Sequence, residues 1–303
     1  MILEQLTEIQ NLINIWIVFM AAVAILCFVV SEITRNYSQV DKLWSLMPIV
    51  YGWITAAIFP SARVFVMAAL VTAWGLRLSY NFSRKGGYNI IPWKGEEDYR
   101  WKVMRENPFL KGRIRFGFFN FFFISFYQNF LILLFSTPLL LAARYQDKPL
   151  TIIDLLAGAF MLIFIIIEGI ADNQLFRFHQ EKKSGENGSG RYKESLRKGF
   201  MTEGLWKYVR HPNFTSEQLI WICFYFFGVA ASGQWINFTL AGPILLILLF
   251  IGSSQLTESI SCRKYPEYEI YKKEVPRFVP WRFLSQTLIK NSYKEPGSAL
   301  SES

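Results

Sequence analysis

The sequence predicts a polytopic α-helical membrane protein. Three observations predict this fold class: composition, apolar segments of membrane-spanning length, and basic residues gathered on one side of those segments. Of the 303 residues, 52% are hydrophobic, with 28 Phe and 10 Trp, which is unusual for a soluble protein. The composition therefore indicates a chain that faces lipid.

Seven apolar stretches approach the roughly 20 residues that a helix needs to cross a hydrocarbon core about 30 Å thick. They cover residues 12–30, 43–59, 62–82, 116–143, 152–171, 212–231 and 235–256. The stretches between them carry too many charges to insert. We therefore expect about seven transmembrane helices in one membrane domain over residues 1–283. A disordered tail is expected over residues 284–303.

The basic residues predict the orientation of these helices, because cytosolic loops hold the excess of Lys and Arg. With the N-terminus outside and the C-terminus cytosolic, 28 of the 32 basic residues fall in cytosolic segments. The outside segments carry only Arg63, Arg144 and Lys148. Topology thus explains the net charge of +9, and we expect no nucleic-acid partner. The expected location is a bacterial inner membrane or the endoplasmic reticulum.

Cysteine and histidine content argues against a metal site. Cys27, Cys223 and Cys262 form no CxxC pair, and we expect them to be packing residues. His179 and His211 are the only histidines, too few for the clusters that membrane di-iron oxygenases require.

Polar residues share one face of the third apolar stretch, where helical spacing aligns Arg77, Asn81 and Arg84. Tyr80 lies beside this face. Two arginines within a membrane protein favour an anionic partner, and a phosphorylated cofactor is one that guanidinium groups bind well. Alternatively, the arginines pair with Glu168 and Asp172, which lie one turn apart at the cytosolic end of the fifth stretch.

The densest polar cluster is GLWKYVRHPNFTSE, residues 204–217, which leads into the sixth stretch. Pro212 suits a first helical turn, so the helix is expected to begin at His211 or Pro212. Its free backbone N–H groups beside Arg210 form a candidate anion site. Asn213 and Glu217 lie one turn apart and enter the membrane together.

The segment after the last stretch places Tyr265, Tyr268 and Tyr271 at helical spacing beyond the membrane-embedded Glu258. This pattern fits an interfacial helix with an aromatic belt, or equally a lid over a bound cofactor.

Taken together, these motifs resemble the steroid 5α-reductase-like membrane family, including its bacterial-type relatives. The resemblance extends over nearly the whole chain. It is carried by VDKLWS (40–45), WGLRLSYN (74–81), EGIADNQL (168–175), GLWKYVRHPNF (204–214) with Glu217, and YPEYEIYKKEVPRFVP (265–280).

The resemblance implies an NADPH-dependent oxidoreductase acting on CH–CH groups. NADPH would lie on the cytosolic side and reduce an activated C=C bond of a steroid-like or other lipid or isoprenoid enone. The positions matching cofactor contacts are Arg77, Tyr80, Arg84, Asp172, Tyr208, Asn213 and Tyr271. The neighbouring cofactor candidates are Asn81, Arg210, His211 and Tyr268.

The same resemblance places Asp41, within a residue or so, where characterised steroid reductases carry a catalytic glutamate. One departure concerns Trp74, which stands where those enzymes carry a tyrosine that polarises the substrate carbonyl. An indole donates a hydrogen bond but supplies no acidic proton. We therefore expect Asp41, Glu217 or Tyr80 to be the catalytic acid, or a substrate other than a steroid enone.

Two other classes remain open. Isoprenylcysteine and phospholipid methyltransferases share an RHP-type motif before a helix and bind S-adenosylmethionine, but they usually lack an Asn at the position of Asn213. A non-enzymatic membrane role is the third alternative, although no inverted repeat typical of a transporter is visible.

Overall fold

The computed structural model describes residues 2–91, 93–185 and 191–280, and no strand occurs in these residues. The chain forms two compact units. Unit 1 comprises Met1–Ile166 and Glu217–Ser253, and unit 2 comprises Ile167–Ser216 and Ser254–Ser303. One membrane domain over residues 1–283 stays a prediction, and the expected tail at 284–303 lies outside the described residues.

The polytopic membrane fold class is confirmed. In the described part of the chain, six helical stretches are long and apolar enough to cross a membrane. They are Leu6–Thr34, Ala62–Arg84, Arg113–Arg144, Ile152–Ser184, Pro212–Ser232 and Phe238–Lys264.

The structure differs from the expectation at the stretch 43–59. Two short helices occupy this region, α2 (Gln39–Trp44) and α3 (Met47–Ile58). With 12 residues, α3 is about 18 Å long, shorter than the hydrocarbon core. Pro48 explains the break, because its ring clashes with the carbonyl of the residue four positions earlier and suits only a first turn.

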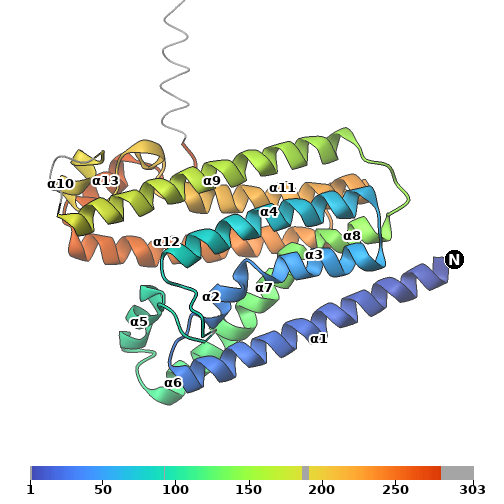
Figure 1. Ribbon diagram of the computed structural model, residues 1–303, viewed down its shortest axis with the longest axis horizontal. Helices are drawn as coiled ribbons and strands as arrows, with labels where there is room; N and C mark the ends of the chain where they lie inside the picture. The colour runs from blue at the N-terminus through green and yellow to red at the C-terminus, as the bar shows by residue number, and fades with distance from the viewer. Residues whose placement is uncertain (1, 92, 186–190, 281–303) are drawn as a thin grey trace, which may run out of the picture. The chain divides into compact units, whose positions relative to one another are not determined.

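Unit 1 holds most of the apolar helices. Figure 1 shows α3 running antiparallel to α4, against which it packs. α1 packs against η1, α7 and α8. The elements of this unit, besides α2 and α3, are α1 (Ile2–Thr34), α4 (Ala62–Arg84), α5 (Tyr99–Glu106), α6 (Arg113–Phe119), the π-helix η1 (Asn120–Tyr127), α7 (Gln128–Ser136), α8 (Pro138–Arg144) and η3 (Phe238–Leu240). It also contains part of each of α9 (Ile152–Ser184), α11 (Pro212–Ser232) and α12 (Ala241–Lys264).

Aromatic side chains dominate the core of unit 1. Trp16, Trp74 and Trp221 are almost fully buried there. The rings of Phe135 and Trp221 lie 4.0 Å apart by their centroids. Large planar side chains fill the space between the helices and hold the polar clusters described below in fixed positions.

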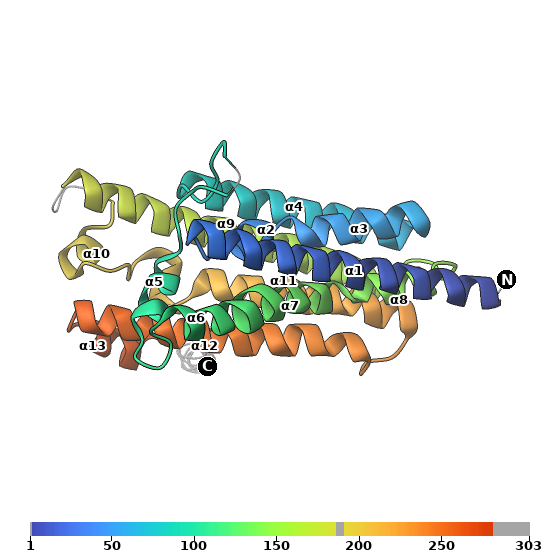
Figure 2. The ribbon, with the colours of Figure 1, turned by 90° about the horizontal axis from the view of Figure 1, so that it is seen from below.

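Unit 2 is smaller and richer in polar residues. Its own short elements are α10 (Lys193–Lys198), the 3-10 helix η2 (Gly204–Lys207) and α13 (Tyr268–Glu274). Figure 2 shows α10 between the end of α9 and α13. Gly204 is required here, because its φ is +63° and a Cβ would lie 2.5 Å from Gln174 Oε1.

Candidate functional site

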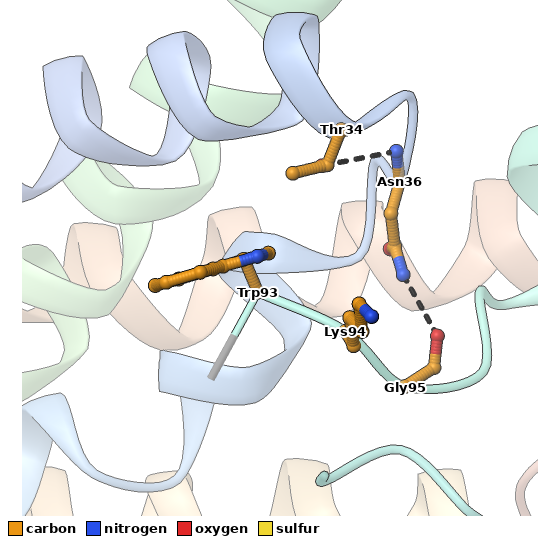
Figure 3. Close-up of a pocket in the computed structure, with 5 residues that line it drawn as sticks. All are labelled: Thr34, Asn36, Trp93, Lys94 and Gly95. Atoms are coloured by element: carbon orange, nitrogen blue, oxygen red, sulfur yellow. Dashed lines mark hydrogen bonds between the residues drawn. The ribbon is translucent and has the colours of Figure 1, made fainter. Parts of the chain in front are cut away.

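A dense set of hydrogen bonds in unit 1 joins two segments, 36–42 and 93–101, which we call the clasp. Five polar contacts between the two segments involve a backbone atom. They are Asn36 Nδ2 to Gly95 O (2.9 Å), Tyr37 N to Glu97 Oε1 (2.9 Å), Asp98 N to Ser38 Oγ (2.9 Å), Gln39 Nε2 to Trp93 O (3.2 Å) and Lys42 Nζ to Lys94 O (2.8 Å). The first of these contacts is drawn in Figure 3. The clasp therefore fixes the backbone that carries Asp41.

Asp41, the predicted acid, is partly buried in this clasp. The indole of Trp101 donates a hydrogen bond from Nε1 to Asp41 Oδ2 at 2.8 Å. Burial and the negative charge of Asp98 raise the pKa of Asp41, against the opposing influence of Arg100 and Trp101. The neutral, protonated form of Asp41 is thus favoured more than in water.

Asp98 is itself held by Arg100. The guanidinium donates from Nε to Oδ1 at 2.9 Å and from Nη2 to Oδ2 at 2.7 Å, and Nη1 donates to Ser253 Oγ at 2.6 Å. Burial raises the pKa of Asp98, but the charge and hydrogen bonds of Arg100 lower it more. The pKa of Asp98 is therefore below its ordinary value. Asp98 thus stays a fixed negative charge beside Asp41.

The helix of Asp41 is also attached to α4. Ser45 and Ser79 share a hydrogen bond of 2.8 Å between their hydroxyl oxygens. The Tyr88 hydroxyl donates to Lys42 O at 2.8 Å. A Cβ at Gly75 would lie 2.5 Å from Ser45 O, so glycine permits this close approach.

A second cluster in unit 1 surrounds Glu217, another predicted acid. Its carboxylate accepts from Trp74 Nε1 at 2.8 Å and from Trp221 Nε1 at 3.0 Å. Arg77 Nη2 lies 3.8 Å from Glu217 Oε2. The two indoles thus donate to different oxygens of the carboxylate, and the Arg77 guanidinium lies within ion-pair distance of it. Trp74, which departs from the reductase pattern, therefore directs its indole N–H to Glu217.

The remaining predicted residues of α4 lie near its C-terminal end. Asn81 is buried, and its Oδ1 accepts from Arg84 Nε at 3.0 Å and Nη2 at 2.7 Å. Tyr80 is 66% exposed, and the Arg84 guanidinium lies 5.4 Å from the centre of its ring. The predicted shared face is present, and in unit 1 Arg77 belongs to the Glu217 cluster while Arg84 joins Asn81 and Tyr80.

In unit 2, Arg210 and His211 converge on Glu258. Arg210 Nε donates to Glu258 Oε1 at 2.8 Å, and His211 Nε2 lies 2.9 Å from the same oxygen. Arg277 Nη2 is 3.5 Å from Glu258 Oε2. Arg210 Nη1 also donates to the carbonyls of Lys272 and Val275. These contacts attach the segment after α13 to the start of α11.

The predicted tyrosines of unit 2 differ in burial. Tyr271 is buried and donates from its hydroxyl to Trp206 O at 2.5 Å. Tyr268 is buried beside it, and both rings pack on Phe200. Tyr208 is 43% exposed. Tyr268 and Tyr271 therefore form part of the packing of unit 2.

The start of α11 falls at Pro212, one of the two residues predicted for it. Asn213 Nδ2 lies 3.4 Å from Asp172 Oδ1, which is a weak hydrogen bond. Asn213 Oδ1 is buried and has no hydrogen-bond partner within the described residues. An acceptor of this kind suits a ligand that brings its own N–H or O–H group.

Sequence reasoning missed the residues that support these acids. Asp98, Arg100 and Trp101 lie about 60 positions from Asp41, so no local pattern links them to it. Glu258 did carry a signal in the sequence, because an acid within an apolar helix is predicted to be buried with hydrogen-bonding partners.

Comparison with known proteins places the chain in a family. Residues 27–275 match the family described as Protein of unknown function (DUF1295). The chain is 35% identical to Uncharacterized protein C594.04c of Schizosaccharomyces pombe over 263 residues, which are 83% of this chain and 74% of that relative. No solved structure matches the chain. The matched range contains every predicted site residue, and the chain belongs to the DUF1295 family.

Proposed function

We propose that this protein is an NADPH-dependent membrane reductase of the steroid 5α-reductase-like kind, which reduces an activated C=C bond of a lipid-like enone. The observation that carries the proposal is Asp41. It is an acid that lies, within a residue or so, where the resembled steroid reductases carry a catalytic glutamate, and burial and Asp98 raise its pKa.

The environment of Asp41 supports reduction over methyl transfer. Reduction of an enone adds a hydride to the β-carbon and needs an acid near the carbonyl oxygen as the enolate develops. Transfer of a methyl group from a sulfonium needs no such acid. Trp101 donates to Asp41 Oδ2, so a proton on the other oxygen, Oδ1, would be the one offered to the substrate oxygen.

NADPH would supply the hydride when bound. In unit 2, the buried Asn213 Oδ1 fits a cofactor that brings an N–H or O–H donor, and Asp172 supplies a second acceptor beside it. Arg210 and His211 support the proposal only indirectly, because their side chains hold Glu258.

A lipid-like substrate follows from the membrane fold. Asp41 lies on α2, which packs against the membrane-spanning helix α1, so the reacting group would enter from the bilayer. A steroid-like or isoprenoid enone combines an apolar body with one polar oxygen, which matches a site that offers a single proton donor.

Ligand titration in detergent tests the proposal. Purified protein is titrated with NADPH, NADH and S-adenosylmethionine, and we expect saturable binding of NADPH in preference to the other two. Asn213→Ala removes the amide and is expected to weaken NADPH binding by about 10-fold. Asn14→Ala, on an exposed part of α1, is the matched control.

Two results would contradict the proposal and favour another function. Binding of S-adenosylmethionine without NADPH would support the methyltransferase class. Binding of none of the three ligands by folded protein would support a non-enzymatic membrane role.

A further inference from the structure

A cavity of about 350 Å³ opens at the clasp. Thr34, Asn36, Trp93, Lys94 and Gly95 line it, as Figure 3 shows. Two of its walls are the end of α1 and the loop 93–95. The backbone carbonyls of this loop already bind Asn36, Gln39 and Lys42. The cavity is therefore built on the same bonds that hold the segment of Asp41.

Most polar groups of the cavity wall are already bonded. Thr34 Oγ1 donates to Val30 O at 2.7 Å and accepts from Asn36 N at 3.4 Å. Asn36 Nδ2 donates to Gly95 O. Lys94 is different, because its side chain is exposed and its ammonium has no hydrogen bond or ion pair within the described part of the chain. The cavity therefore offers a ligand the Lys94 cation beside the exposed indole of Trp93.

Apolar side chains in the loop 93–95 and shortly before it in the chain are exposed. Ile90 is 101% exposed, and Trp93 is 51% exposed. Exposed Ile and Trp beside a lysine are typical of a segment in the interfacial layer of a bilayer, where indoles lie at the level of the headgroups. A lysine in that layer faces lipid phosphates rather than hydrocarbon.

We infer that this cavity binds the headgroup phosphate of an anionic glycerophospholipid, paired with the Lys94 ammonium, while Trp93 and Ile90 contact the lipid around it. Charge complementarity selects the headgroup. None of the described residues that line the cavity is a carboxylate, so the ammonium of a zwitterionic headgroup finds no counter-ion among them. This inference does not depend on the proposed reductase activity.

Bound lipid would act directly on the clasp. The carbonyls of Trp93 and Lys94 each accept a hydrogen bond from the segment that carries Asp41. A lipid that orders the loop 93–95 therefore orders residues 36–42 as well.

Native mass spectrometry of the full chain in detergent tests the inference, with phosphatidylglycerol and phosphatidylcholine supplied at equal concentrations. We expect preferential retention of phosphatidylglycerol. Lys94→Gln is expected to reduce that retention about fivefold, because one lysine at an anionic surface is replaced by a neutral group. Lys94→Arg keeps the charge and retains the lipid. Lys102→Gln, which removes an exposed lysine outside the cavity, is the matched control.

Several results would overturn the inference. Equal retention of the two lipids would remove the role of the anionic headgroup. Equal losses in Lys94→Gln and Lys102→Gln would show a general effect of charge. Displacement of the lipid by millimolar inorganic phosphate would identify a site for free phosphate. Thermal melting checks that each variant is folded, and Trp93→Ala, which leaves the charge unchanged, is expected to reduce retention independently.

Discussion

Asp41 in unit 1 and Glu258 in unit 2 are both carboxyl groups within polar clusters, but their neighbours differ. Glu258 is 2% exposed and faces Arg210, His211 and Arg277. Asp41 receives one indole N–H and lies near the charge of Asp98. Glu258 is thus surrounded by donors, whereas Asp41 is placed beside another acid.

This difference separates a structural carboxylate from a candidate catalytic one. Donors around Glu258 satisfy it and anchor the segment after α13. Burial lowers the pKa of His211 more than Glu258 raises it, so the imidazole is neutral near pH 7 and stabilises Glu258 by a hydrogen bond. Asp41 instead retains a proton more readily than an ordinary aspartate, which is the property of a general acid.

The largest expected effect is a loss of stability in Glu258→Gln. This change leaves Arg210 buried without its carboxylate, and removing one partner of a buried ion pair typically costs about 3–5 kcal/mol. Denaturant unfolding in detergent measures the loss. Glu269→Gln, at an exposed carboxylate 3.5 Å from Lys272, is the control and should change stability far less than Glu258→Gln does. Equal stability of the two variants would contradict a structural role for Glu258.

Asp41→Asn is expected to lower stability by less than about 1 kcal/mol, because an amide resembles the neutral acid and still accepts from Trp101. Under the proposed function, substrate-dependent oxidation of NADPH is lost, while binding of NADPH is kept. Unfolding and turnover assays measure these effects separately. A loss of stability as large as that of Glu258→Gln would make Asp41 a structural residue.

The pH dependence of stability tests the same residue. Because the pKa of Asp41 is raised on folding, the native state binds its proton more strongly than the unfolded chain does. Its stabilising contribution is therefore full below the ordinary value near 3.9 and is lost as pH rises through the raised pKa. Wild type should lose stability relative to Asp41→Asn over that range. A difference independent of pH would contradict the raised pKa.

Asp98→Asn is expected to move the titration of Asp41 to lower pH. It removes the negative charge that favours the proton on Asp41 and frees Arg100 to oppose it. The carboxylic C=O stretch in infrared difference spectra follows this titration, with Asp41→Asn identifying the band. Asp147→Asn, at an exposed acid in another loop, should leave the midpoint unchanged. A shift to higher pH would show that Asp98 is not the dominant charge.

Trp101→Phe should shift the titration of Asp41 less than Asp98→Asn does, and in the opposite direction. It removes the indole N–H that stabilises the ionised form, so the midpoint of the Asp41 titration rises. Loss of one hydrogen bond is expected to cost about 1 kcal/mol of stability. The same infrared titration distinguishes Trp101→Phe from Asp98→Asn. If both variants shifted the midpoint of the Asp41 titration in the same direction, the roles given to Trp101 and Asp98 would be wrong.

The local properties of the chain could be read from sequence. Apolar runs identify membrane-spanning helices because a bilayer has a fixed thickness, and Pro212 marks the start of α11 because its ring suits a first turn. Pro48 was an equally local signal, and it divides α2 from α3 where the apolar pattern predicted one span. The prediction of Asp41 as an acid came from resemblance, and it stays a prediction.

The partners of each polar group were decided only by the tertiary structure. Trp74 and Glu217 are 143 positions apart, Asp41 and Trp101 are 60 apart, and Arg210 and Glu258 are 48 apart. Helical periodicity places a side chain on a face but does not say which residue of a distant helix meets it. For this reason the sequence alone placed Arg210 and His211 at an anion site, whereas in the fold they hold Glu258, because a buried carboxylate must be satisfied by the donors nearest to it in space.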